Sequence, residues 1–279
     1  MFGRVAILLL LCLGLLQAQT LRFGITSVAI KDDLFAVREW ANFLERQSGL
    51  DIQVVFAKNY DEIKYLLENG GVDFAYVCGA TYVKAKENAQ IEVLSLPYVQ
   101  GSATYYSLSI ARNDSRFDSL FDFQGAHYAF SDPRSNSGAI VPVYVLQKAG
   151  WDYRRFFGKV IYTYDHAESI LAVAEGFVDG ASVDSIVFDN FSNIYPQIAE
   201  TIKVIDRFGP FTTTPIVVRQ NLPAATRQTL QNAFSQMAHD PSGQAVLSRF
   251  GIDWFETPKD YDYGTIEHMI NTIRGHKWE

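Results

Sequence analysis

Short apolar runs typical of buried strands alternate with helical segments along almost the whole chain, and this rhythm constrains the fold more than any other feature of the sequence. Alternation of this kind predicts α/β architecture, with parallel-rich sheets that are flanked by helices. In the first block, the predicted strands are residues 21–25, 52–57, 74–77 and 91–96, and the predicted helices are residues 34–47, 61–68 and 80–88.

The rhythm is interrupted once and then resumes, which divides the chain into two blocks. The second block has predicted strands at residues 126–130, 160–164, 180–183, 202–205 and 216–218, and helices at residues 139–148, 167–175 and 185–191. Residues 103–111 and 208–214 are extended runs that we interpret as two crossing strands, which act as the hinge between two lobes. Lobe 1 is predicted to comprise residues 19–104 and 212–279, and lobe 2 residues 105–211. Ligands bind beyond the carboxyl ends of strands in such sheets, so the cleft between the lobes is the expected site.

The first eighteen residues, MFGRVAILLLLCLGLLQA, predict a cleaved secretory signal peptide. They carry one positive charge at Arg4, an apolar core over residues 5–16, and the small residue Ala18 at the expected cleavage point. Cys12 lies too deep in the apolar run for lipoprotein processing, so a lipid anchor is not expected. No later segment approaches the ~20 apolar residues of a membrane-spanning helix. We therefore expect an exported mature chain, without direct insertion into a membrane.

The acidic composition argues against one class of partner. The chain has 24 basic and 31 acidic residues, a net charge of −7. Nucleic acid is not an expected partner, because its phosphate backbone requires basic patches. A small anion is not excluded, since backbone dipoles can hold it in a closed cleft. Loss of the leader leaves Cys78 as a single cysteine, so no intramolecular disulfide is expected.

The stretch SDPRSNSGAIVP places small polar residues directly before a predicted helix. These residues are Ser135, Asn136, Ser137 and Gly138. They can form a helix N-cap, because their side chains accept hydrogen bonds from the free N–H groups of a first turn. They can also form an anion cradle, in which N–H groups, hydroxyls and the positive end of the helix dipole converge on an oxyanion. Pro142 is compatible with both, because it delays or distorts the helix and leaves N–H groups unpaired near Ser137 and Gly138.

Three segments resemble the family of periplasmic phosphate-, phosphite- and phosphonate-binding proteins. SDPRSNSGAIVP resembles the signature DP-x-S-T-S-G-x-x-x-P, and YDHAESILAVAEGFVDGASVDS resembles the histidine-containing segment that follows it. NYDEIKYLLENGGVDFAYVCGATYV is similar to the first-lobe segment, in which a tyrosine begins a helix. The resemblance extends from residue 21 to about residue 250. It implies a type II periplasmic binding protein whose two lobes close on an oxyanion and deliver it to the permease of an ABC transporter.

The resemblance also implies particular ligand-binding residues. The matching positions are Ser135, Asn136, Ser137, Gly138, His166, Tyr60 and Tyr105. Hydroxyls and backbone N–H groups donate to an anion without bringing a fixed charge, and a histidine donates either as a neutral ring or as a cation. Each of three residues also has a structural role as the alternative to ligand binding. His166 can cap a helix, the Tyr105 ring can pack in the core, and Tyr60 can form a hydrophobic staple at a helix start.

Departures from the family pattern narrow the expected ligand. Asn136 stands where the signature has a threonine, which exchanges a hydroxyl for an amide. Relatives that take aminoalkyl phosphonates place acids in two later segments, and the matching positions here are the uncharged Ile186 and Thr214. Asp184 lies close to the first of these and is included in the site, but the simpler expectation is a ligand without an amine, such as phosphate, phosphite or a small alkylphosphonate. The cradle contains no arginine, which disfavours a carboxylate ligand.

Cys78 supports an alternative function. It follows the predicted strand 74–77, where a ligand-facing residue would lie. Some relatives are periplasmic sensors for two-component kinases, and the arsenite-responsive ones depend on a cysteine. The alternative is therefore a sensory binding protein that uses Cys78 for arsenite or another oxyanion and contacts a sensor kinase. Cysteine is also among the most buried residue types, so simple packing is the competing interpretation.

Enzymatic activity is not predicted. The sequence contains no HExxH, no Ser-His-Asp order at a nucleophile elbow, and no clustered Cys/His spacing. Catalytic residues, a metal and a cofactor are therefore not expected.

Overall fold

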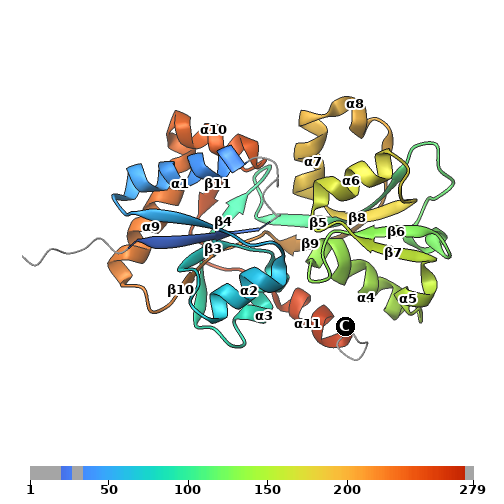
Figure 1. The fold of residues 1–279 in the computed structure, drawn as a ribbon, viewed down its shortest axis with the longest axis horizontal. Coiled ribbons are helices and arrows are strands. Elements are labelled where there is room, and N and C mark those ends of the chain that lie inside the picture. The colour runs from blue at the N-terminus through green and yellow to red at the C-terminus, as the bar shows by residue number, and fades with distance from the viewer. Residues whose placement is uncertain (1–19, 27–33, 274–279) are drawn as a thin grey trace, which may run out of the picture.

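The computed structural model describes residues 20–26 and 34–273, so the predicted signal peptide lies outside the described residues. The chain forms two lobes, each built on one β-sheet with flanking helices (Figure 1). The strand order is β11-β4-β10-β3-β1-β2 in the six-stranded sheet of the first lobe and β7-β6-β8-β5-β9 in the five-stranded sheet of the second lobe. This is the two-lobed α/β arrangement that the sequence predicts. Within the described residues, no helix combines the length and apolarity needed to cross a membrane.

The first lobe follows the predicted strand–helix rhythm and adds antiparallel strands to it. Its strands are β1 (Leu21–Ile25), β2 (Ile52–Phe56), β3 (Phe74–Tyr76), β4 (Ile91–Tyr98), β10 (Ile216–Arg219) and β11 (Trp254–Glu256). Its helices are α1 (Leu34–Ser48), α2 (Tyr60–Glu68), α3 (Gly79–Ala85), α9 (Ala224–Gln236) and α10 (Pro241–Arg249). Strand β1 pairs in parallel with β2 and β3, as βαβ units require, whereas β10 and β11 pair antiparallel with their neighbours.

The second lobe has the same mixed character. Its strands are β5 (Thr104–Arg112), β6 (His127–Phe130), β7 (Lys159–Tyr162), β8 (Gly180–Asp184) and β9 (Ile202–Thr212). Its helices are α4 (Val141–Lys148), α5 (Tyr153–Phe156), α6 (His166–Ala174), α7 (Ser185–Ile194) and α8 (Pro196–Ala199). Strand β6 pairs in parallel with β7 and β8, while β5 pairs antiparallel with β8 and β9. The strand predicted at 202–205 and most of the crossing predicted at 208–214 form one continuous strand, β9, which ends at Thr212.

Two connections join the lobes, one between β4 and β5 and the other between β9 and β10. They are tied together by Thr213, whose N–H donates to the Ala103 carbonyl at 3.0 Å and whose Oγ1 donates to the Pro97 carbonyl at 2.9 Å. The Tyr263 hydroxyl donates to the Thr213 carbonyl at 2.6 Å. Because the two connections share these bonds, they form one hinge.

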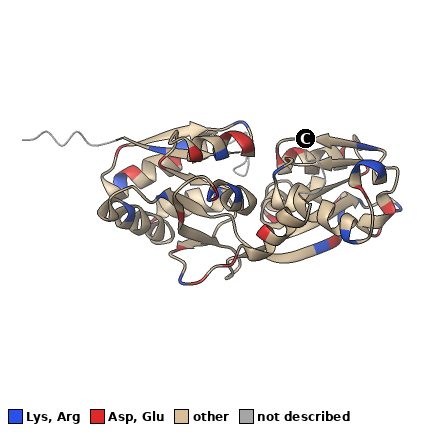
Figure 2. Cartoon of the chain, turned by 90° about the horizontal axis from the view of Figure 1, so that it is seen from below, with Lys and Arg blue, Asp and Glu red and all other residues tan. Residues whose placement is uncertain are grey.

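Each lobe has an apolar core of its own. In the first lobe, the Trp40 ring of α1 lies 5.5 Å from Phe23, 4.9 Å from Phe250 and 5.6 Å from Phe255, measured between ring centroids. The core of the second lobe includes Leu108, Ile110, Ile170, Val173 and Val183. Burial of one such side chain contributes about 1.5–3 kcal/mol. Charged residues of both signs are interspersed over the two lobes (Figure 2).

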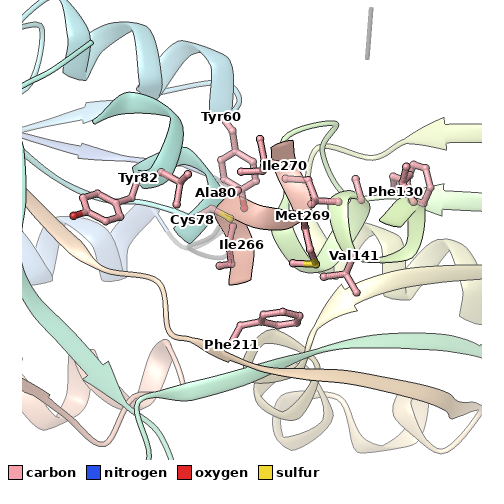
Figure 3. Packing of buried hydrophobic residues seen from close by; sticks show 14 of the residues in the cluster. Tyr60, Cys78, Ala80, Tyr82, Phe130, Val141, Phe211, Ile266, Met269 and Ile270 are labelled. Carbon is pink, nitrogen blue, oxygen red and sulfur yellow. The ribbon is translucent and has the colours of Figure 1, made fainter. Parts of the chain in front are cut away.

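The last described helix, α11 (Gly264–Ile273), lies between the lobes (Figures 1 and 3). It contacts α3 of the first lobe as well as α4 of the second lobe. Its buried residues are Ile266, Met269, Ile270 and Ile273. They belong to one apolar cluster that extends from Ala80 in the first lobe to Val141 in the second. The helix therefore forms an apolar bridge between the lobes, in addition to the covalent hinge.

Candidate functional site

The SDPRSNSG stretch follows directly on the carboxyl end of β6. Ser135 caps the turn, because its Oγ accepts a hydrogen bond from the Gly138 N–H at 3.0 Å. A π-helical turn, Asn136–Ile140, comes next, and in it the Ile140 N–H donates to the Ser135 carbonyl at 2.9 Å. Helix α4 then begins, with Pro142 as its second residue, where proline is tolerated. The capping interpretation of this stretch is therefore correct for Ser135, and it is compatible with a cradle.

Ser137 presents two donors within this turn. Its backbone N–H has no backbone partner among the described residues, although Ser137 is only 2 % exposed, and its Oγ is the second donor. Its carbonyl is fixed by the Ser107 Oγ, which donates to it at 2.6 Å. Unpaired donors in a buried position cost about 1–3 kcal/mol. The position therefore suits a ligand that accepts hydrogen bonds.

Gly138 is required by the close approach of the turn to Ser131. A Cβ at position 138 would lie 1.8 Å from the Ser131 Oγ and 3.0 Å from the Ser135 Oγ. Any larger residue would force the Ser131 side chain out of its position. The glycine of the sequence motif is thus explained by packing against the end of β6.

His166 points a single donor toward the turn. Its Nδ1 accepts a hydrogen bond from the Asp184 N–H at 3.1 Å, so the ring proton is on Nε2. Nε2 lies 3.4 Å from both the Ser131 Oγ and the Ser135 Oγ. Burial lowers the pKa of His166 to about 3, so the ring is neutral at physiological pH. The alternative role as a helix cap is not seen, because Asp165 caps α6.

Tyr60 and Tyr105 place their phenol groups in the cleft, near the turn that contains Ser137. Tyr60 is the first residue of α2, where Asn59 provides the cap. The Tyr105 hydroxyl accepts a hydrogen bond from the Asn136 Nδ2 at 2.8 Å, which leaves its own proton free to donate. Burial is the main cause that raises the pKa of both phenols well above the ordinary value, so both stay protonated. The charge of the Asp184 carboxyl adds to both increases.

Cys78 faces the cleft and contacts the turn. It is the residue that precedes α3, and its Sγ accepts a hydrogen bond from the Asn136 N–H at 3.5 Å. Burial raises the pKa of the thiol to about 11, so it is a neutral thiol and not a thiolate. In the part of the chain that the structure describes, no group of three His, Cys, Asp or Glu side chains could hold a metal ion.

Asp184 lies at the carboxyl end of β8 and caps α7. Its Oδ1 accepts from the Ile186 N–H at 2.8 Å and from the Val187 N–H at 3.3 Å. Burial raises the pKa of the carboxyl to about 7 despite these two bonds. The carboxyl lines a cavity of about 20 Å³ together with Ile186, Tyr76 and Thr214. This is room for roughly one water-sized group.

The structure thus brings the nine predicted site residues together, and it adds neighbours that were not among the predicted site residues. Ser131 and Asp132 follow β6, and Tyr76 ends β3 and accepts a hydrogen bond from the Thr214 Oγ1 at 2.6 Å. Asp132 accepts from the Tyr60 N–H at 3.3 Å, and burial raises the pKa of Asp132 to about 6. Their position at the carboxyl ends of strands is the signal that could have found them.

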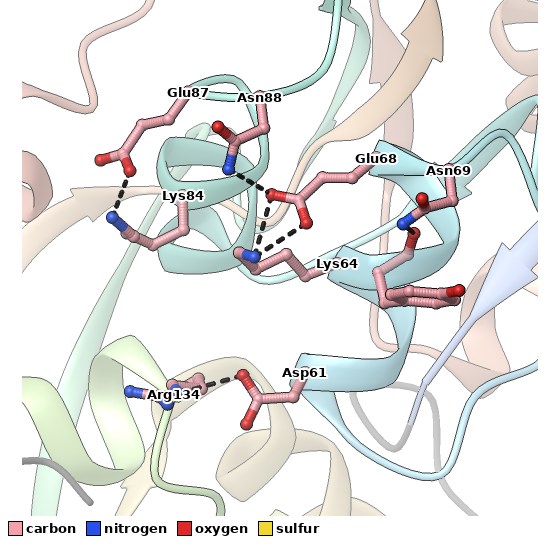
Figure 4. A network of polar contacts seen from close by, with 9 residues as sticks. Asp61, Lys64, Glu68, Asn69, Lys84, Glu87, Asn88 and Arg134 are labelled. Atoms are coloured by element: carbon pink, nitrogen blue, oxygen red, sulfur yellow. Dashed lines mark hydrogen bonds and ion pairs between the residues drawn. The ribbon is translucent and has the colours of Figure 1, made fainter.

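Contacts across the cleft show that the lobes are closed on each other. The Tyr60–Asp132 hydrogen bond joins α2 to the loop after β6. The Arg134 Nε forms an ion pair with the Asp61 carboxylate at 3.1 Å between the same two segments (Figure 4). The site is therefore enclosed by both lobes.

Two hinged α/β lobes closed over a buried polar cleft define a periplasmic binding protein. Residues 23–263 match the family of ABC transporter phosphonate periplasmic substrate-binding proteins, and the chain belongs to this family. The family that the sequence motifs predicted is confirmed. It is a family of substrate-binding proteins and not of enzymes, which agrees with the absence of predicted catalytic residues.

Individual relatives are similar over much of the chain. The chain is 28% identical over 262 residues to the phosphonates-binding periplasmic protein of Escherichia coli (strain K12), which is 91% of this chain and 76% of the relative. It is 30% identical over 155 residues to the phosphate-import protein PhnD of Mycolicibacterium smegmatis, 52% of this chain and 48% of that relative.

Solved structures agree with the fold. A binding protein component of an ABC phosphonate transporter from Pseudomonas aeruginosa has a TM-score of 0.82 and 25% identity, with 90% of this chain and 85% of that chain covered. PhnD1 of Prochlorococcus marinus (MIT 9301) was solved in complex with methylphosphonate. It has a TM-score of 0.83 and 17% identity, with 92% of this chain and 98% of that chain covered. Because the sequence identity to PhnD1 is low, the similarity between these two structures shows only that they share a fold.

Proposed function

We propose that this chain captures a phosphorus oxyanion without an amine in the cleft between its lobes and delivers it to the permease of an ABC transporter. Phosphate, phosphite and small alkylphosphonates are the proposed ligands. The proposed ligand-binding residues are Ser135, Asn136, Ser137, Gly138, His166, Tyr60, Tyr105, Cys78 and Asp184.

The convergence of neutral donors on one buried place carries this proposal. Ser137 offers its backbone N–H and its Oγ, His166 aims its Nε2–H at the same turn, and the two tyrosines keep their phenol protons. Asp184 is protonated up to a pH of about 7, so its carboxyl can donate as well. Such a set of donors favours a ligand that presents several acceptor oxygens, because each buried donor must be paired.

The surroundings of Asp184 support a ligand without an amine. The adjoining cavity of about 20 Å³ is too small for an aminoethyl arm, and its neighbours Ile186 and Thr214 are uncharged. One carboxyl that is half-protonated near neutral pH is a weak partner for an ammonium group. A methyl group, a hydrogen atom or a hydroxyl fits this space better.

The relatives support the ligand class and the partner. The relative from Escherichia coli is named for phosphonates, that from Mycolicibacterium smegmatis for phosphate import, and the PhnD1 structure holds methylphosphonate. The family functions in the periplasm as part of ABC transporters. We propose that residues 1–18 direct this chain to that compartment and are then removed.

A thermal-shift and titration panel on the mature protein tests the proposal. The panel contains methylphosphonate, phosphite, phosphate, 2-aminoethylphosphonate and acetate. A ligand at about 100 times its dissociation constant adds roughly 2.7 kcal/mol, which is several degrees in melting temperature. We expect shifts with the first three compounds, a weaker shift with the amine, and none with acetate. A shift with the amine alone, or with none of the phosphorus compounds, would contradict the proposal.

The contact of Cys78 with the turn is the one observation that favours the sensory alternative. Its Sγ lies 3.5 Å from the Asn136 backbone nitrogen, so a ligand in the cleft could reach it. The raised pKa of the thiol argues against the thiolate that arsenite binding requires. Alkylation of Cys78 before the panel, with arsenite added, separates the two functions. A shift with arsenite that alkylation removes would favour the sensor, and an unchanged methylphosphonate shift would favour the transport protein.

A further inference from the structure

A second cavity lies between the lobes and shares only Tyr60 with the proposed ligand-binding residues. Its volume is about 260 Å³, close to the lower end of the roughly 300–1,000 Å³ typical of small-molecule pockets. Its walls come from α2 and α3 of the first lobe, from the SDPRSNSG turn of the second lobe, and from α11. The apolar part of the lining is Ala80, Pro133, Ile140, Ile270 and Ile273.

Most of the charged side chains that line this cavity are cations. Lys64, Lys84 and Arg134 line it, and Asp61 is the acidic residue among the lining side chains (Figure 4). Two of the cations come from the first lobe and one from the second. A group placed between them therefore experiences an attraction for negative charge from both lobes.

The ion pairs already present at the rim do not remove this attraction. Lys64 pairs with Glu68 at 2.9 Å, and Lys84 pairs with Glu87. Neither glutamate lines the cavity. Pairs this close to solvent contribute about 0–1 kcal/mol, so an anionic ligand can share the lysines with them or replace them.

Thr81 provides an independent sign of a ligand. Its side chain lines the cavity and is 2 % exposed, yet its Oγ1 has no hydrogen-bond partner among the described residues. An unpaired buried hydroxyl costs about 1–3 kcal/mol. A threonine in a helix can bond to a carbonyl of the preceding turn, but this one does not. Its hydroxyl is thus free to bind a polar group inside the cavity.

We infer that this cavity binds a small organic anion, with an apolar body against the isoleucines and an acidic group held by Lys84, Arg134 and the Thr81 hydroxyl. The volume exceeds what one inorganic oxyanion needs, and the apolar floor disfavours one. Three lining cations against one lining carboxylate disfavour an amine. The Asp61–Arg134 pair is exposed, so an anionic ligand can share Arg134 with Asp61 or replace it, as it can for the two lysines. A carboxylate on a ring or short chain fits these features.

The position of the cavity couples this anion to the oxyanion site, a step that depends on the proposed function. The cavity is complete only when the lobes are closed, because both lobes and α11 form its walls. A ligand that binds the closed form better than the open form shifts the population toward closure. By linkage, each of the two ligands then increases the affinity for the other by the same factor.

The test uses phenylacetate as the probe and phenylacetamide as its neutral match. We expect phenylacetate, but not the amide, to raise the melting temperature of the mature protein. It should also tighten methylphosphonate binding by about fivefold or more in calorimetric titrations. Thr81→Val and Lys84→Met should each reduce the phenylacetate effect, while methylphosphonate alone binds as before. Lys86→Met is the matched control, because Lys86 follows the same helix but does not line the cavity.

Equal shifts with acid and amide, or no shift with millimolar phenylacetate, would overturn the inference. An acid effect that survives in both Thr81→Val and Lys84→Met would overturn it too. If phenylacetate shifts the melting temperature but methylphosphonate does not bind, the cavity assignment stands and the proposed function fails. If methylphosphonate binds and phenylacetate has no effect on its affinity, the proposed function stands and the coupling fails.

Discussion

Gly138 shows how a single residue determines the shape of the turn. The absence of a side chain lets the turn pack against Ser131, and this packing brings the Ser135 Oγ and the His166 Nε2 to the same place. The residue is therefore required by sterics, and not by an unusual backbone conformation.

Gly138→Ala should weaken both folding and binding. The new Cβ would collide with the Ser131 side chain, and overpacking of this kind costs about 1–3 kcal/mol. Denaturant unfolding measures the first effect, and titration with methylphosphonate the second. Ser137→Ala is the control, since it removes a hydroxyl without a collision: it should keep the stability and weaken binding by about 1–3 kcal/mol. Normal binding by Gly138→Ala would show that the turn is not part of the site.

Asp184 makes binding depend on pH in a defined direction. The pKa of its carboxyl is raised to about 7, so the group is a neutral donor below that pH and an anion above it. Above a pH of about 7 it loses the donated hydrogen bond and repels a bound anion. The ratio of the wild-type dissociation constant to that of Asp184→Asn should rise about three- to tenfold between about pH 6 and pH 8. Using the ratio removes the titration of the ligand itself, and a constant ratio would place Asp184 outside the site.

At the scale of elements, the sequence predicts where strands and helices lie better than how they pair. The apolar run Phe74–Tyr76 marks a buried strand, because a strand that is covered on both faces has little need of polar positions. The antiparallel pairing of β5 and β9 depends on how the chain passes from one lobe to the other, and no local sequence pattern encodes this path. For the same reason, β9 appears as two short segments in the sequence but is one strand in the sheet.

The hinge offers a prediction at this scale. Thr213→Val would keep the shape of the side chain but leave the buried Pro97 carbonyl without the Oγ1 donor. We expect a loss of about 1–3 kcal/mol in the free energy of unfolding. Thr201→Val is the matched control, because the Thr201 hydroxyl bonds to a carbonyl at an exposed position and its loss should stay within ~0.5 kcal/mol. Equal effects of the two substitutions would mean that the hinge bond does not stabilise the fold.

At the scale of the whole molecule, the sequence indicates the residues of the candidate site but not their geometry. Ser135 to Gly138 and His166 are indicated by the resemblance to the family motif, because small polar residues at the start of a helix taken alone are equally typical of an N-cap. The motif does not reveal that His166 is neutral or that Cys78 touches the turn, since both depend on burial by segments distant in the chain. The cavity beside Tyr60 cannot be predicted from the sequence for the same reason, because its walls come from three separate parts of the chain.

The bridge made by α11 also gives a prediction for the molecule as a whole. Met269→Ala should lower the free energy of unfolding by about 2–5 kcal/mol and shift the lobes toward the open form, since Met269 is 4 % exposed and belongs to the cluster that joins them. Small-angle X-ray scattering should then show a larger radius of gyration without ligand, and methylphosphonate should bind more weakly. Asn271→Ala, on the exposed side of the same helix, should change neither quantity. An unchanged radius in Met269→Ala would show that the bridge does not hold the lobes.

The apolar bridge has a consequence for how long a captured molecule stays bound. Opening the cleft separates α11 from at least one lobe and exposes Ile266 and Met269 to water, which costs free energy whether or not a ligand is present. Part of the barrier to release therefore belongs to the protein and not to the ligand contacts. We expect this part of the barrier to be the same for every ligand, so that residence times differ less among ligands than their affinities do.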